Sequence, residues 1–260
     1  VRSRRQRQMR IRDRLDAMQN VQEVVPFSEL SSPLKSETSL NINFGVKYNP
    51  SDNFSFDFNF FNNKVNDLIE WKLVATGENN INIYSYFNVN QVETKGLEFN
   101  ATYKKTDNWE IKFGYQLLYA YDTEVVKDIE KDDSDYYALD TETLTSIKLN
   151  KDDYFGLFNR SRHMGNIKLN YHLNEKSDLN AMLTYRSKYA LSDSNGNEIL
   201  DAYDKFIESY SLCDVGVTHQ INSLKSCQIG IKNIFGFINP EYISNITGRL
   251  YYINFKINFK

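Results

Sequence analysis

Apolar and polar residues alternate along most of this chain with a period of two. The alternation runs through residues 40–48, 54–60, 97–103, 109–119, 166–173, 179–186, 213–218 and 251–259. In the last segment, for example, Phe255 stands between Asn254 and Lys256. Successive side chains of a strand point to opposite faces of its sheet, so the pattern predicts strands with one apolar and one polar face. We expect about nine strands, many of them long enough to cross a bilayer when tilted.

The expected connections alternate in length. Short polar turns are predicted near residues 49–53, 105–108, 174–178 and 222–225, and longer links at about 76–83, 125–160, 191–207 and 236–247. Short turns at one end and long loops at the other are typical of an outer-membrane barrel, with the short turns on the periplasmic side. The predicted fold class is therefore all-β: an antiparallel meander of about nine long strands forming part of a transmembrane β-barrel.

Composition changes this picture only in part. The mean hydropathy of −0.57 would also suit a soluble protein, but 18 Tyr, 17 Phe and only 4 Pro favour strands. Several aromatic residues flank the expected short turns, where an interfacial girdle would lie: Tyr48, Phe54, Tyr103, Trp109 and Tyr171. Cations on the polar face suit a water-filled or plugged lumen: Lys47, Lys112, Lys168, Arg186 and Lys256. A small self-contained structural barrel and a soluble all-β binding domain stay open as alternatives.

Six short motifs, in order along the chain, resemble a known family. They are residues 34–39 (LKSETS), 65–69 (VNDLI), 88–99 (NVNQVETKGLEF), 162–169 (RHMGNIKL), 230–242 (GIKNIFGFINPEY) and 248–252 (GRLYY) with the final strand. In this order they resemble the C-terminal barrel portion of the TonB-dependent outer-membrane receptors. Ser36 stands where the family usually has proline, and the proline expected in the fourth motif is missing.

This resemblance implies a receptor that takes up a scarce nutrient complex of the ferric siderophore, haem or cobalamin type, or a glycan. The implied partners are the nutrient ligand, outer-membrane lipid, an N-terminal plug with the remaining barrel strands, and TonB; the implied location is the bacterial outer membrane. The family's barrel has about 22 strands around a plug. We therefore expect residues 33–260 to be a C-terminal barrel fragment, without the plug and without transport activity of its own. Residues 1–32 are basic and match nothing in the family; we expect a helical or disordered leader.

No catalytic signature stands out, so we expect no enzyme and no cofactor, and the net charge of −3 gives no sign of a nucleic-acid partner. Ligand contacts are expected from residues in or beside the long links: His163, Tyr136, Tyr137 and Arg160. In a haem receptor, His163 could ligate iron. The acidic stretch 122–135 is interpreted as a solvated loop or as part of an extracellular lid.

No metal site is expected either. Residues 193–198 faintly resemble a calcium loop, but with Gly196 at the sixth position the first falls on Leu191 and the twelfth on Ala202. Turn chemistry is the better interpretation. A hairpin turning near residues 222–225 would place Cys213 and Cys227 too far apart for a disulfide, so both are expected to be free thiols.

Overall fold

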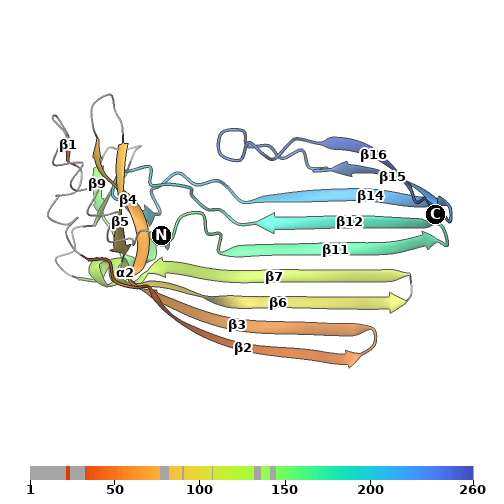
Figure 1. Ribbon diagram of the computed structural model, residues 1–260, viewed down its shortest axis with the longest axis horizontal. Coiled ribbons are helices and arrows are strands. Elements are labelled where there is room, and N and C mark those ends of the chain that lie inside the picture. The colour runs from red at the N-terminus through yellow and green to blue at the C-terminus, as the bar shows by residue number, and fades with distance from the viewer. Residues whose placement is uncertain are drawn as a thin grey trace.

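Nine long antiparallel strands form one sheet within the part of the chain that the computed structural model describes (Figure 1). The described residues are 22–23, 33–76, 82–89, 91–106, 108–131, 136–140 and 145–259. The nine strands are β2 (Thr38–Ser51), β3 (Phe54–Asn66), β6 (Val92–Thr106), β7 (Trp109–Asp122), β11 (His163–Asn174), β12 (Ser177–Arg186), β14 (Tyr210–Asn222), β15 (Lys225–Lys232) and β16 (Leu250–Ile257). Each pairs with the next along the chain, which confirms the predicted meander.

The strand register gives the sheet two chemically different faces. Residues directly opposite one another share a face, and Phe54, Tyr103, Ile111 and Leu169 follow one another across four strands. We call this side the apolar face. It lies open: Phe255, for example, is 72% exposed. Among the described residues no protein layer covers this aromatic surface, which is typical of a wall facing lipid.

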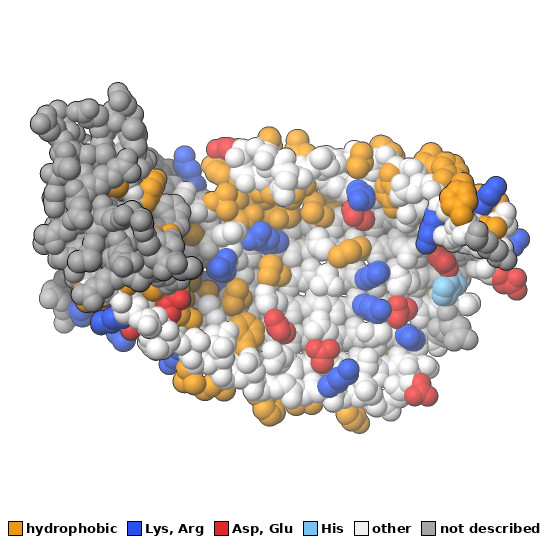
Figure 2. All heavy atoms as spheres, viewed as in Figure 1, with side chains coloured by type: hydrophobic (Ala, Val, Ile, Leu, Met, Phe, Trp, Pro, Cys, Tyr) orange, Lys and Arg blue, Asp and Glu red, His pale blue; other side chains and the backbone are white. Residues whose placement is uncertain are grey.

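The opposite side, which we call the polar face, carries amide and charged residues. Asp57, Asn100, Gly114 and Asn166 lie in one row across β3, β6, β7 and β11. Figure 2 looks onto this side: Lys, Arg, Asp and Glu side chains are spread over the middle strands, and hydrophobic side chains gather along the upper and lower edges. The predicted division of the alternating residues between two faces is therefore confirmed.

The short turns are where the sequence predicts them. The hairpins turn after Ser51, Thr106, Asn174 and Asn222, and these four turns lie together at one end of the sheet (Figure 1). Asn222 shows how such a turn is held, because its side-chain oxygen accepts hydrogen bonds from the backbone N–H groups of Leu224 and Lys225. The long links lie at the opposite end of the sheet.

One predicted link is wrong in its bounds. The link expected at about 76–83 is only the middle of a longer connection, because β3 ends at Asn66 and the next strand of the main sheet, β6, begins at Val92. Between them, β4 (Leu68–Thr76) and β5 (Asn82–Val89) form a separate hairpin, which β1 (Gln22–Glu23) extends. Asp67, with a φ of 54°, breaks the strand at this point. The hairpin strands keep a strand-like composition, so the sequence pattern does not reveal the change of sheet.

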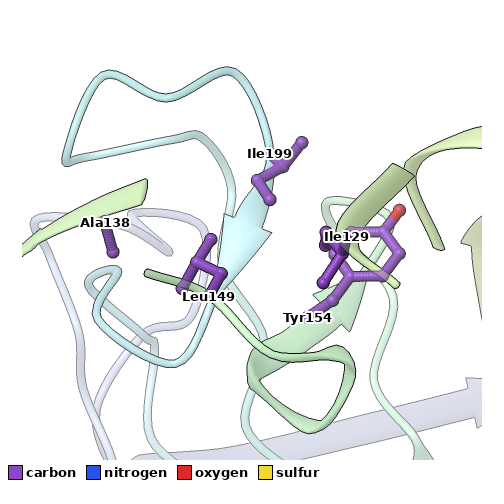
Figure 3. Packing of buried hydrophobic residues seen from close by; sticks show 5 residues of the cluster. All are labelled: Ile129, Ala138, Leu149, Tyr154 and Ile199. Carbon is purple, nitrogen blue, oxygen red and sulfur yellow. The ribbon is translucent and has the colours of Figure 1, made fainter. Parts of the chain in front are cut away.

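The 125–160 link is more ordered than a plain loop. It contains α2 (Thr123–Ile129), β8 (Tyr137–Asp140), β9 (Thr145–Lys148), the 3-10 turn η3 (Lys151–Asp153) and β10 (Tyr154–Gly156). Strand β10 pairs with β13 (Leu200–Asp201) from the next long link. A small hydrophobic cluster joins these pieces (Figure 3): Ile129, Ala138, Leu149, Tyr154 and Ile199. The two links therefore form one packed layer at the long-loop end.

Two further expectations concern the cysteines and the N-terminal leader. Cys213 and Cys227 are free, as expected, and Cys227 lies opposite His219 on β14. Among the residues described, no helix is long and apolar enough to span a bilayer. The proposed leader, residues 1–32, lies outside the described residues apart from the two of β1.

Candidate functional site

The polar face carries a hydrogen-bonded network near the short turns. Glu110 accepts a hydrogen bond from Asn170 Nδ2 at 2.8 Å and lies 3.2 Å from Lys112 Nζ and 3.8 Å from Lys104 Nζ. His172 and Asp178 are in contact on the neighbouring pair of strands. Because each carboxylate here already has its partners, this part of the wall is electrostatically satisfied and gives no specific sign of a ligand.

The long-loop end of β12 is different, because its cation, Arg186, has no acidic partner among the described residues. Arg186 Nε donates to Ser161 Oγ at 2.8 Å, and Nη2 donates to Asn159 Oδ1 at 3.1 Å. The guanidinium also lies 3.5 Å from the centre of the Tyr189 ring. Arg186 pairs in register with Met164 and Tyr210 and so belongs to the polar face.

Three more cations lie on the segments that flank Arg186 and its register partner Met164. Arg160 Nη1 lies 3.3 Å from the Asn159 carbonyl oxygen, and Arg186 Nη2 lies 3.4 Å from the same atom, so two guanidinium groups meet at one carbonyl. Arg162 lies 4.5 Å from the centre of the Phe155 ring, and Lys188 Nζ lies 4.7 Å from that of Phe206. We call Arg160, Arg162, Arg186 and Lys188 the cation cluster.

In the described residues, the contacts of the cation cluster are to aromatic rings and neutral oxygens. In the described part of the chain none of its four members forms an ion pair with a carboxylate. The Nε of Arg162 is buried and has no hydrogen-bond partner among those residues. Guanidinium groups prefer carboxylate or phosphate oxygens and bind them with strong charge-assisted hydrogen bonds. The cluster therefore presents uncompensated positive charge at the long-loop end.

A hollow in the wall adjoins the cluster. It has a volume of about 580 Å³ and is lined on the polar side by Glu98, Asn100, Gln116, Met164, Arg186 and Tyr210. Tyr210 is stacked on Phe237, with ring centres 4.5 Å apart and an angle of 7° between the planes. Glu98 is already bound by Gln116 Nε2 at 2.9 Å. Arg186 thus borders a hollow that combines an aromatic stack with polar groups, as ligand sites commonly do.

The structure separates the residues that the sequence nominates for ligand contact. Arg160 belongs to the cation cluster. His163 pairs in register with Leu117 on the apolar face, where its Nδ1 lies 2.8 Å from the Tyr115 hydroxyl, so it points away from the hollow. Tyr136 and Tyr137 lie in the loop layer.

In that layer Tyr136 packs against the hydrophobic cluster, and burial, reinforced by Asp128, raises the pKa of its hydroxyl. Tyr137 is exposed on β8, and its carbonyl accepts a hydrogen bond from Asn197 at 3.0 Å. The acidic stretch is partly structural, because Asp122 caps α2 by accepting from the backbone N–H of Glu124 at 2.8 Å. Its residues 132–135 lie outside the described residues.

Turn chemistry explains residues 193–198, as predicted. The Asp193 carboxylate accepts from the backbone N–H groups of Asn195, Gly196 and Glu198 at 2.7–2.9 Å. Asp201, fully buried, accepts from the side chains of Asn195 and Asn197. No group of three or more metal-ligating side chains is present among the described residues.

Sequence reasoning placed Arg186 on the polar face and nominated Arg160, but it did not connect the two or identify Arg162 and Lys188. A signal was available: no Asp or Glu occurs from residue 154 to 174 or from 179 to 192, although both stretches contain cations. Charge segregation of this kind indicates cations without local partners.

Comparisons with known proteins agree with this architecture. A family profile described as "TonB dependent receptor-like, beta-barrel" matches residues 16–234. The ferric enterobactin receptor of Pseudomonas aeruginosa is similar in structure, with 20% identity and a TM-score of 0.59 over 87% of this chain and 32% of that receptor. The ferric-catecholate import receptor Fiu of Escherichia coli gives 14% identity and a TM-score of 0.53 over 92% and 32%.

The copper transporter OprC is also similar, with 14% identity and a TM-score of 0.59 over 88% of this chain and 32% of the transporter. No curated protein sequence matches the chain. The chain spans about a third of the length of each solved structure named here. At these identities the solved structures establish the fold, and the profile covers most of the sequence. The chain therefore belongs to the TonB-dependent receptor family, as part of its β-barrel.

Proposed function

We propose that this chain forms part of the wall and the outer loops of an outer-membrane receptor that imports a scarce, negatively charged nutrient complex. Members of the family are transport receptors, not enzymes. Of the ligand types implied by the sequence, a ferric siderophore or haem fits this proposal better than cobalamin, because both can present anionic oxygens. A plug filling the lumen and TonB as the source of energy are part of the same proposal.

The dimensions of the apolar face support a membrane location. Near the short turns Trp109 and Tyr171 lie opposite each other, with ring centres 4.5 Å apart. Towards the long-loop end of the same strands, Tyr115 and His163 form a second interfacial pair. Eight residues separate Tyr171 from His163, which is about 27 Å along a strand and roughly 21 Å across a bilayer at the usual tilt. That span is close to the apolar band of about 25 Å in such barrels.

The cation cluster carries the proposal for the ligand's charge. The four cations at the long-loop end have no carboxylate partner among the described residues, so they would repel one another and cost stability unless an anion binds them. A ligand entering from the loop side would meet the cluster beside the hollow that Arg186 and Tyr210 line. Two of the similar solved structures are receptors for iron complexes by their own descriptions, which supports this class of ligand.

The sharpest test replaces Arg186 by glutamine in the gene product that carries this chain. Binding to outer-membrane fractions would be measured with a radiolabelled ferric catecholate, with haemin and with cobalamin. Losing a charge-assisted interaction of about 1.5–3 kcal/mol predicts roughly 10- to 100-fold weaker binding of the anionic ligand. Lys168→Gln, a cation on the same face but farther from the loops, is the matched control and should bind like the wild type.

Two results would count against the proposal. One is unchanged binding of every anionic ligand in Arg186→Gln at equal protein level. The other is an equal loss in the Lys168→Gln control, which would indicate a general effect of charge on the wall instead of a site at Arg186.

A further inference from the structure

The apolar face changes character sharply near the long-loop ends of β2, β3, β6 and β7. The row formed by Phe44, Phe60, Leu97 and Leu117 is entirely hydrophobic. The next row on the same face, two residues further along each strand, reads Ile42, Asn62, Lys95 and Tyr119, and the one beyond it reads Leu40, Lys64, Glu93 and Tyr121. Within two rows, a hydrophobic wall becomes a polar, lysine-bearing one.

Lys95 and Lys64 both contact neighbouring side chains at this boundary. Lys95 Nζ donates to the Tyr121 hydroxyl at 2.9 Å and lies 5.1 Å from the centre of that ring. Lys64 Nζ lies 3.8 Å from Glu93, and its side chain is 43% exposed. An ammonium group has three N–H donors, so each lysine keeps donors available for another anion. Between them, Asn62 Oδ1 is buried and has no hydrogen-bond partner among the described residues.

These lysines cannot serve a ligand in the lumen. They occupy the register of Leu97 and Leu117, whereas Arg186 of the cation cluster lies on the polar face. Long cationic side chains at the edge of a hydrophobic wall extend along it and place their charge at the level of the lipid headgroups. Tyrosines beside them suit the same depth, because the ring is apolar and the hydroxyl is polar.

We propose that Lys64 and Lys95 bind phosphate groups of lipids in the leaflet on the long-loop side. The row of Asn62, Lys95 and Tyr119 then marks the membrane boundary. This inference rests on the proposed outer-membrane location but is independent of the nutrient ligand. Eight residues separate Tyr103 in the short-turn girdle from Lys95, so the boundary lies about 27 Å along the strand from that girdle.

The experiment uses the gene product that carries this chain, recovered from outer membranes and placed in nanodiscs. The probes are lipid A, a phosphorylated glycolipid, and its dephosphorylated form, and bound lipid is counted by native mass spectrometry. Wild-type protein should retain lipid A in preference to the dephosphorylated form. The double variant Lys64→Gln/Lys95→Gln should lose this preference at least about two-fold. The matched control removes two lysines from the polar face, Lys112→Gln/Lys168→Gln, and should retain it.

Lys95→Arg, which keeps the charge, should behave like the wild type and so separates loss of charge from misfolding. Equal retention of both lipids by the wild type would overturn the inference, and so would an equal loss in the polar-face control. Failure to find the protein in the outer membrane would instead refute the proposed location, and with it the lipid-phosphate site at Lys64 and Lys95. A normal lipid preference together with absent nutrient binding would refute the proposed ligand alone.

Discussion

Gly96 is the position at which one added methyl group should do the most damage to the sheet. It lies on the polar face of β6, opposite Phe61 on β3, with Leu118 beside it on β7. A Cβ atom there would lie 2.0 Å from the Leu117 carbonyl oxygen and 2.8 Å from Phe61 Cζ. The oxygen belongs to the backbone, so it can move away only if the pairing between β6 and β7 opens.

The expected cost of Gly96→Ala follows from these contacts. Forcing a methyl group into a packed site costs about 1–3 kcal/mol. Weakening one ladder hydrogen bond adds about 1 kcal/mol. Replacing glycine lowers the entropy of the unfolded chain and returns about 0.5–1 kcal/mol. The net expectation is a loss of about 1–3.5 kcal/mol, a large share of the 5–15 kcal/mol typical of a folded domain.

Gly45→Ala on β2 is the matched control. It lies on the same face, but its added Cβ would have nothing nearer than Asn59 Oδ1 at 3.5 Å. Urea titration of the protein in detergent, followed by tryptophan fluorescence, would measure both variants. At a slope near 2 kcal/mol per molar, Gly96→Ala should lower the midpoint by about 1 M and Gly45→Ala should leave it nearly unchanged. Superimposable curves for the two variants would refute the packing argument.

Two further predictions concern the loop layer. Burial raises the pKa of Tyr154 to about 12, so the folded state favours the neutral hydroxyl. The loop layer should therefore keep this contribution to its stability below pH 10 and lose it as the pH rises from 10 to 12. Hydrogen exchange of α2 should show a smaller loss of protection over this range in Tyr154→Phe. That variant also removes the hydrogen bond from the Asp122 N–H to the Tyr154 hydroxyl and should cost about 1 kcal/mol at neutral pH; unchanged exchange would contradict this. Asp201→Ala leaves three half-buried donors without their acceptor, so it should make residues 193–204 sensitive to limited proteolysis. Asp152→Ala, at an exposed position, should not have this effect, and equal cleavage rates would contradict the role of the buried Asp201 carboxylate.

The sequence determined the wall of this protein. Strand side chains alternate strictly between two faces, so residues 251–259 could be assigned an apolar and a polar side without any knowledge of their neighbours. Short turns such as the one after Asn222 are local structures, held by a side chain two or three residues away. The meander, the two faces and the short-turn positions were therefore predictable from local information. The six short motifs, in their order along the chain, indicated the family.

Tertiary structure decided everything that depends on contacts between distant segments. The hairpin of β4 and β5 leaves the main sheet although its strands look like the others, because pairing between strands is a non-local choice. The hydrophobic cluster of the loop layer joins Ile129 to Ile199, 70 positions apart in the sequence. His163 turned out to face the apolar side, whereas Arg160 and Arg186 meet at the Asn159 carbonyl. Sequence composition showed cations without nearby acids; only the fold brought them to one end of the barrel wall, because charge complementarity is fixed by distances in space and not along the chain.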